Sequence, residues 1–480
     1  MIRFVVSVVA PSLRVRHFVS VLLISTPLFA TTDIPKTKAS VCGLTAVEAA
    51  RLNVDPSADV RALSDYRKGI YLLLKSRRFD QLDCLADSAR SQREMFPGGI
   101  WKLHTMYLGL QTPPLHPTQQ DWNRHMSLVR EWVSAKPKSI TARIALAESY
   151  VSYGWDARGN GFSDSVSNSG WKLFDQRVSQ AVQVLKGARG LPKKCPEGYV
   201  AMQQVALAQG WRPNTKKALL EEAVQFEPAY YYYYRGYATS ILPKWDGHEG
   251  DAEQFLKIAA DHVAGDAGDI LYFQVAAYLA CCQTDEQLKL SWPRIQKGFR
   301  ALERASGPAL ENTNYLARLA SIYQDPLVAN RMFIRIGEQW SEEIWRTSTY
   351  FESVKQWATQ MSSTMQKQNQ EEEAAEANLL TVEGQRYKAA IDRTIESVIP
   401  ECIKENGVQT GNFEMLFHIQ KDGMIGTVTT VGINRVGFCV MQKIQTTGSQ
   451  NRAAFPPPPK PDYWVRYDLL PENFPSQAMK

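Results

Sequence analysis

The densest group of side chains that could do chemistry lies in the hexapeptide DGHEGD, which holds Asp246, His248, Glu249 and Asp251. Carboxylates and imidazoles ligate metal ions and transfer protons in hydrolases. However, the sequence has no second cluster with ligand spacing, and no G-x-S-x-G, H-E-x-x-H or phosphate-loop motif. We therefore interpret the hexapeptide as a polar loop in which Asp251 caps the next helix, and we predict no catalytic residue, no metal and no cofactor.

Two other segments combine tryptophan with glycine, WDARG at 155–159 and PKWDG at 243–247. An indole wall, a fixed guanidinium and close backbone approach at glycine are parts from which recognition pockets are built. Trp155, Arg158 and Trp245 are accordingly candidate binding residues. The alternative is a structural role, with the indoles wedged between helices and Arg158 bonded to carbonyls at a helix C-terminus.

Five consecutive tyrosines at 230–234 raise the question of whether this segment is a strand or a helix. No partner strand lies nearby in the sequence, and Pro228 is well suited to the first turn of a helix. On a helix, Tyr230 faces the core with Tyr233 or Tyr234, whereas Tyr231 and Tyr232 lie on the flanks. We predict a helix and take Tyr231 and Tyr232 as further candidate binding residues, with packing between repeats as the alternative.

The composition is that of an ordinary soluble globular protein, with 44% hydrophobic and 22% charged residues in a chain of 480. The formal net charge is +6, but residues 1–30 hold three Lys/Arg and no Asp/Glu, so the rest of the chain carries only +3. This balance gives no reason to expect nucleic acid or an anionic membrane as the main partner.

The first 30 residues have the pattern of an export signal. Arg14 and Arg16 precede an apolar run at 18–29, and Ala30 stands at a suitable cleavage point. We predict that residues 1–30 are a signal peptide, that the mature protein is periplasmic, and that no transmembrane span remains after cleavage. An uncleaved membrane anchor is the alternative.

Seven cysteines would then meet an oxidising compartment, and none forms a C-x-x-C pair. Cys402 and Cys439 fall in one small C-terminal module, so we predict a disulfide between them, with buried free thiols as the alternative.

From about Thr45 to Thr359, segments with helical periodicity alternate with short breaks such as FPGG at 96–99. Paired helices without strand-like alternation predict an α-solenoid or irregular helical array over residues 31–360. Residues 361–380 are rich in Gln, Glu and Ala and indicate a solvated helix or linker. Residues 381–480 begin with an amphipathic helix, and the Lys-Asp-Gly turn at 421–423 indicates a hairpin. A helix and a strand follow, which gives a ββαβ order.

Two family resemblances rest on these segments. The array resembles an uncharacterised bacterial family of tetratricopeptide-like helical-repeat proteins, through the WDARG and PKWDG segments and the tyrosine run. This resemblance implies a helical-repeat fold and no established activity. The last ~70 residues resemble the TonB C-terminal domain, which implies a small α+β module of cell-envelope proteins. Its matching motif residues are Phe413, Phe417, Ile419, Cys439, Val440 and Ile444.

Taken together, the sequence predicts a mainly α, non-enzymatic scaffold or interaction protein of the bacterial cell envelope. It would bind a protein or peptide through the helical surface and another envelope component through the TonB-like module. One alternative is an envelope hydrolase or metal-dependent enzyme with its site near Arg158 and residues 246–251. The other is a TonB-type energy transducer with an uncleaved N-terminal anchor.

Overall fold

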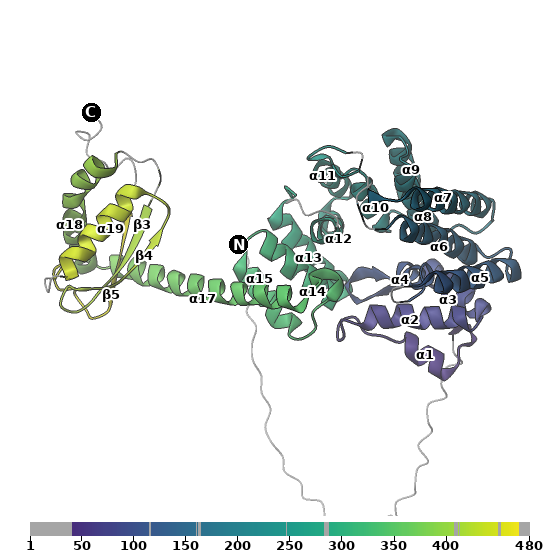
Figure 1. The fold of residues 1–480 in the computed structure, drawn as a ribbon. Helices are drawn as coiled ribbons and strands as arrows, with labels where there is room; N and C mark the ends of the chain where they lie inside the picture. The colour runs from purple at the N-terminus through teal and green to yellow at the C-terminus, as the bar shows by residue number, and fades with distance from the viewer. Residues whose placement is uncertain are drawn as a thin grey trace, which may run out of the picture.

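The computed structural model describes residues 41–114, 117–159, 161, 165–245, 247–282, 288–407, 411, 413–449 and 453–469. The chain is mainly helical, with a small sheet near its C-terminus (Figure 1). The predicted signal peptide lies outside the described residues. Among the helices that are described, none combines the length and the apolar character that a membrane crossing requires.

The helical array has an inner layer formed by the even-numbered helices, each of which packs against the next even-numbered one. This layer comprises α2 (Ala62–Lys75), α4 (Lys102–Leu110), α6 (Ile140–Arg158), α8 (Glu197–Ala208), α10 (Tyr232–Ser240), α12 (Gly265–Cys282), α14 (Leu310–Ile322) and α16 (Glu342–Trp345).

The odd-numbered helices pack on the inner layer. They are α1 (Ala46–Leu52), α3 (Phe79–Ser91), α5 (Gln119–Ala135), α7 (Asn168–Arg189), α9 (Pro213–Phe226), α11 (Asp251–Val263), α13 (Trp292–Ser306) and α15 (Pro326–Ile336). One continuous hydrophobic core runs through both layers, from Leu63 to Ala358. The prediction of a mainly helical protein is confirmed.

Helix α6 illustrates how the sequence produces a central element. Ser139 caps its N-terminus, because its hydroxyl accepts a hydrogen bond from the Ala142 N–H at 2.9 Å. Most residues between Ile140 and Gly154 are buried on every side, as expected for a helix packed between neighbours rather than on a surface. Gly159 adopts a φ of 74° and ends the helix.

The FPGG segment at 96–99 separates two helices and also forms the turn of a short hairpin. Residues Met95–Phe96 (β1) and Ile100–Trp101 (β2) pair in a short hairpin around the turn η2 (Pro97–Gly99), although the sequence shows no strand pattern here. Gly98 has a φ of 76°, and its carbonyl accepts a hydrogen bond from Asn312 Nδ2 at 3.0 Å. A Cβ at Gly98 would lie 2.5 Å from Ala309 Cβ. Only glycine allows the hairpin to approach α14 this closely.

Further contacts join the first and last helices of the array. The Leu310 N–H donates to the Pro56 carbonyl at 2.9 Å, and the Val60 N–H donates to Gln339 Oε1 at 3.1 Å. Arg67 on α2 forms an ion pair with Glu343 on α16 at 2.7 Å. The array therefore closes on itself instead of ending as an open solenoid.

The tyrosine run is helical only in part. Helix α10 begins at Tyr232, whereas Tyr230 and Tyr231 lie in the preceding turn, so Pro228 does not occupy the first helical turn. All five side chains from Tyr230 to Tyr234 are buried. Tyr231 and Tyr232, which were predicted on the flanks of a helix, are therefore also buried, and they line the inside of the closed array.

The C-terminal module contains α18 (Val382–Asn406), β3 (Phe413–Ile419), β4 (Ile425–Val431), α19 (Arg435–Ser449) and β5 (Tyr463–Leu469). The strands form an antiparallel sheet in the order β4-β3-β5. The ββαβ order after α18 is as the sequence predicts. A separate core joins Ile391 and Ile395 of α18 to Phe413 and Phe417 of β3 and Val440 of α19.

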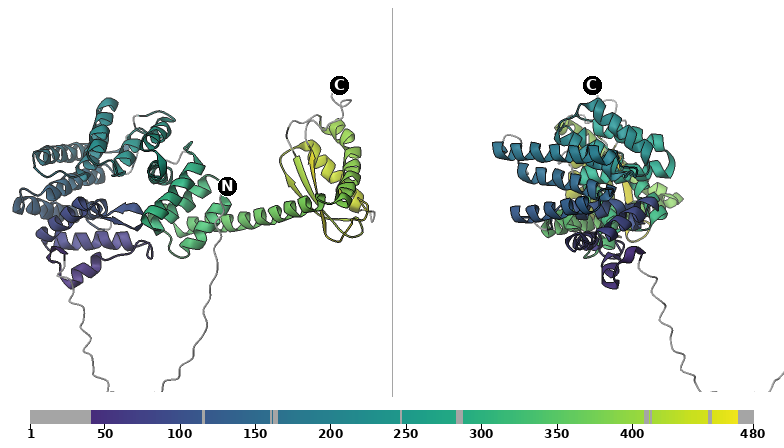
Figure 2. Two further views of the ribbon diagram at one scale, coloured as in Figure 1. Left: turned by 180° about the vertical axis from the view of Figure 1, so that it is seen from behind. Right: turned by 90° about the vertical axis from the view of Figure 1, so that its right-hand side faces the viewer.

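Helix α17 (Ser348–Leu379) connects the array with this module, as the views of Figures 1 and 2 show. Its first part packs on α15, where Phe351 is buried, and its last part packs on β5. Glu371 accepts a hydrogen bond from Thr429 Oγ1 at 2.8 Å, and Asn378 Nδ2 donates to the Trp464 carbonyl at 2.9 Å. The Gln/Glu/Ala-rich segment at 361–380, for which the sequence indicates a solvated helix or a linker, thus lies almost entirely within helix α17. It is not fully solvated, because its last part packs against the sheet.

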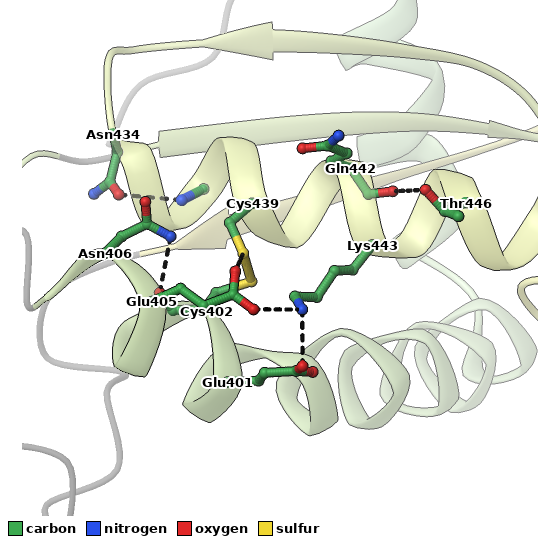
Figure 3. The surroundings of a disulfide bond; sticks show 10 residues. Glu401, Cys402, Glu405, Asn406, Asn434, Cys439, Gln442, Lys443 and Thr446 are labelled. Carbon is green, nitrogen blue, oxygen red and sulfur yellow. Dashed lines mark hydrogen bonds and ion pairs between the residues drawn. A yellow bond between two sulfur atoms is a disulfide. The ribbon is translucent and has the colours of Figure 1, made fainter.

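Two disulfides lie among the described cysteines. Cys402 of α18 and Cys439 of α19 are bonded, with a Cα–Cα distance of 5.7 Å (Figure 3). The Lys443 ammonium lies beside them, 2.9 Å from Glu405 and 3.0 Å from Glu401. A second bond, Cys42–Cys84, ties the start of the array to α3 and was not predicted.

Replacing Gly98 tests the closure of the array. Gly98→Ala should destabilise the protein by about 3 kcal/mol, because it adds left-handed backbone strain to a clash with α14. The matched control is Gly210→Ala, which has a φ of 59° but open space around its Cβ, and should cost only about 1 kcal/mol. Urea unfolding followed by circular dichroism measures both. Equal losses would contradict a special role for Gly98.

The Cys402–Cys439 bond should rigidify the terminal module. Replacing both cysteines with serine releases a loop with a sequence separation of 37 and should cost about 2–4 kcal/mol. Hydrogen exchange measured by mass spectrometry should then accelerate in β3 and α19. The control variant, Cys42→Ser with Cys84→Ser, should accelerate exchange in α1–α3 instead. An unchanged β3 and α19 in the first variant would count against this role.

Candidate functional site: the central cavity

The inner helices of the closed array line a partly open hollow of about 540 Å³, which we call the central cavity. Every even-numbered helix from α2 to α16 contributes a side chain to its wall, and so does the loop after α10. Its volume lies in the range of small-molecule and short-peptide sites. Because α2 and α16 stand at opposite ends of the array, the cavity exists only when the array is closed.

Four of the five predicted binding residues line this cavity. They are Trp155, Tyr231, Tyr232 and Trp245. The rings of Trp155 and Trp245 meet at a centroid distance of 6.0 Å and an angle of 72°. Among the described residues, the Trp245 indole nitrogen is buried without a hydrogen-bond partner. The two tryptophan segments, which lie far apart in the sequence, thus form one wall.

Arg158, the fifth predicted residue, is not part of the cavity wall. Its guanidinium lies over the rings of Trp155 at 5.4 Å and Trp171 at 5.3 Å. It donates hydrogen bonds to the carbonyls of Gly159 and Gly161 at the end of α6. The structure therefore gives Arg158 the structural role that the sequence left as the alternative, in which it supports Trp155 from outside the cavity.

Tyr231 and Tyr232 form a second part of the aromatic wall of the cavity, beside Trp155 and Trp245. Tyr231 donates a hydrogen bond to the Tyr232 hydroxyl at 2.8 Å. The imidazole of His104 on α4 stacks on Tyr232 with a centroid distance of 3.6 Å. Burial raises the pKa of both phenols, so both hydroxyls remain neutral at physiological pH.

Arg235 also lines the cavity, although it is not among the predicted binding residues. Its Nε donates to the Gln274 carbonyl at 3.0 Å. Its guanidinium lies 4.7 Å from the ring centroid of Tyr231 and 5.0 Å from that of Tyr278. Burial would lower the pKa of Arg235, but the neighbouring phenols and Glu311 raise it overall, so the side chain stays charged.

Glu311, in the first turn of α14, also lines the cavity and is not among the predicted binding residues. Burial raises the pKa of its carboxyl group, while the charge of Arg235 opposes that rise. An acidic residue in the first turn of a helix is common for reasons of the helix dipole alone. The sequence therefore holds no signal that could have distinguished Glu311 from other such residues.

A buried acidic pair lies behind the cavity wall. Glu197 accepts hydrogen bonds from Tyr230 and from His104 Nδ1, the latter at 2.9 Å. Burial alone would raise the pKa of Glu197, but the charge of His104 and these hydrogen bonds lower it overall. Burial and the nearby charge of Glu197 raise the pKa of Glu148 well above its ordinary value. Glu148 thus holds a proton while Glu197 is ionised.

The described residues of the hexapeptide, 247–251, do not form a metal or acid–base site. His248 is exposed, and Glu249 forms a surface ion pair with Lys289 at 2.9 Å. The predicted cap is wrong, because Gly250 occupies the N-cap with a φ of 88° and Asp251 instead accepts the His248 N–H at 2.8 Å. Asp246 lies outside the described residues. Elsewhere in the described chain, no group of three His, Cys, Asp or Glu could hold a metal ion.

No protein-family model, curated protein or solved structure matches this chain. The tetratricopeptide-like and TonB-like resemblances therefore stay predictions from the sequence.

The acidic pair gives opposite predictions for two isosteric changes. Glu197→Gln should destabilise the protein by about 2–4 kcal/mol at pH 7, because it removes the charged acceptor of His104 and Tyr230. Glu148→Gln should be neutral or stabilising at pH 7. The raised pKa of Glu148 costs stability above pH 4.5, its ordinary value, so any gain should shrink as the pH falls towards that value. Urea unfolding at pH 7 and pH 5 measures both changes, and equal losses would contradict the assignment.

Proposed function

We propose that this chain is an exported, non-enzymatic binding protein of the cell envelope that holds a peptide segment in its central cavity. The observation that carries the proposal is the wall itself. Indole and phenol rings from five separate segments surround two charged side chains, Arg235 and Glu311. No set of groups for nucleophilic or metal chemistry accompanies them in the described residues. Aromatic rings with a few fixed polar groups are what ligand recognition requires.

Two features of the array support a tetratricopeptide-like repeat fold as part of this proposal. Helices alternate between an inner and an outer layer, and successive inner helices pack on one another. Stacked helix pairs of this kind place one helix of each pair on the concave side, where repeat proteins bind their partners.

The terminal module would dock the protein to a second envelope component, in line with its TonB-like sequence. Strand β4 lies at one edge of the sheet. Val431 at its end and Ile433 just beyond are both exposed, Ile433 to 91%. An open strand edge beside apolar side chains can accept a partner strand. Periplasmic location remains part of the proposal and rests on residues 1–30 of the sequence.

Peptide binding can be tested with a library of random-sequence tripeptides. The purified protein should retain a subset of them in affinity selection read by mass spectrometry. Trp245→Ala should weaken retention about tenfold or more, as loss of a buried aromatic contact does. The control is Trp211→Ala, a partly buried tryptophan outside the central cavity. Failure of the wild-type protein to retain any peptide, or equal retention by the two variants, would refute the proposal.

A further inference from the structure

Among the described residues, five acidic, basic or imidazole side chains line the central cavity, and two of them lack a partner of opposite charge. Arg67 is paired with Glu343, and His104 is bonded to Glu197. Arg235 and Glu311 form no ion pair with each other or with any other described residue, although each influences the pKa of the other. Two opposite charges that are not paired with each other in a largely buried cavity require an explanation, because desolvating an unpaired charge is costly.

The surroundings of Arg235 leave one part of its guanidinium free. Tyrosine rings contact the group, and Nε is bonded to the Gln274 carbonyl. The two terminal nitrogens form no hydrogen bond with the described residues and are not fully buried. A guanidinium fixed in this way presents a planar fork to the cavity, which matches the two oxygens of a carboxylate.

Glu311 offers the opposite chemistry. Neither carboxyl oxygen is hydrogen-bonded to a described residue, and neither is fully buried. The ring of Tyr315, one helical turn further along α14, lines the same cavity. A carboxylate beside an aromatic ring suits an ammonium group, which the carboxylate pairs and the ring attracts. A bound ammonium would also offset the cost of burying the ionised carboxylate.

The pairing of charges narrows the class of ligand. A purely anionic ligand, such as a phosphate, would bind Arg235 but be repelled by Glu311. A purely cationic ligand would leave Arg235 without a counter-charge, and a neutral ligand would satisfy neither group. A ligand with one carboxylate and one ammonium satisfies both.

We infer that the central cavity recognises a zwitterionic ligand of the kind a short, free-ended peptide provides. Its carboxylate binds the terminal nitrogens of Arg235, and its ammonium group binds the carboxylate of Glu311. The aromatic wall formed by Trp155, Tyr231, Tyr232 and Trp245 contacts the part of the ligand between the two charges. This inference rests on the proposed function and adds the two side chains that would bind the charged ends of the ligand.

The test uses the same tripeptide library in three forms: with free ends, with a C-terminal amide, and with an N-terminal acetyl group. Binding is followed by affinity selection and by the rise in melting temperature that a ligand of the native state produces. The wild-type protein should bind the free-ended form at least tenfold more tightly than either blocked form.

Variants should separate the two contacts. Arg235→Met should bind the free-ended and amidated forms equally while still rejecting the acetylated form. Glu311→Gln, which is isosteric, should show the reverse pattern. Arg235→Lys keeps the charge without the fork and should give an intermediate preference for the free carboxylate. Arg130→Met is the control, because Arg130 also lies over a tyrosine ring but outside the cavity. It should behave as the wild type.

The outcomes distinguish this inference from the proposed function. If the wild-type protein binds blocked and free-ended peptides equally, the zwitterion inference is wrong while peptide binding stands. If no form of the library binds, the proposed function itself fails. If Arg235→Met and Glu311→Gln lose affinity for all forms alike and keep wild-type circular dichroism, the two residues do not read the peptide ends, and the inference is overturned.

Discussion

Closure of the helical array is the constraint on which the rest of the structure depends. A row of helix pairs buries its core between neighbours and leaves its first and last members half covered. Here the β1–β2 hairpin solves that problem by seating two glycines against α13 and α14, where Asn312 bonds to the Gly98 carbonyl. The ends of the array cover each other, and the space between the inner helices becomes the central cavity. The candidate site therefore depends on the contacts that close the array.

The elements themselves could largely be read from the sequence. Helical periodicity and short breaks indicate the helix pairs, and the Lys-Asp-Gly turn indicates the β3–β4 hairpin, because these signals are local. The predictions that failed concern surfaces. The segment at 361–380 shows little apolar periodicity, yet Glu371 and Asn378 are buried because they meet Thr429 and Trp464, which lie 58 and 86 residues further along the chain. No local pattern encodes such partners.

The residues of the candidate site likewise fall into those that the sequence indicates and those that it does not. Tryptophans and clustered tyrosines are uncommon enough for the sequence alone to indicate candidate binding residues. Four of the candidates do line one cavity, namely Trp155, Tyr231, Tyr232 and Trp245. Arg235 and Glu311 are ordinary residues on ordinary helices. They share a cavity because α10 and α14 both belong to the inner layer, which contacts such as Asn312–Gly98, 214 residues apart, close around the hollow. Arg158 has the residue type of a binding residue, but it is bonded to the Gly159 and Gly161 carbonyls outside the cavity. Residue type indicates what a side chain can do, whereas closure decides which side chains act together.

Helix α17 has a geometric consequence beyond joining two parts of the chain. It runs for 32 residues without a break, which corresponds to about 48 Å at about 1.5 Å per residue. Both of its ends are embedded, one beside Phe351 in the array and the other against β5. Each residue adds a rotation of about 100° as well as a rise, so the number of residues in the helix fixes both the distance and the relative orientation of its two ends. Its length determines how far the sheet stands from the cavity and in which direction β4 faces.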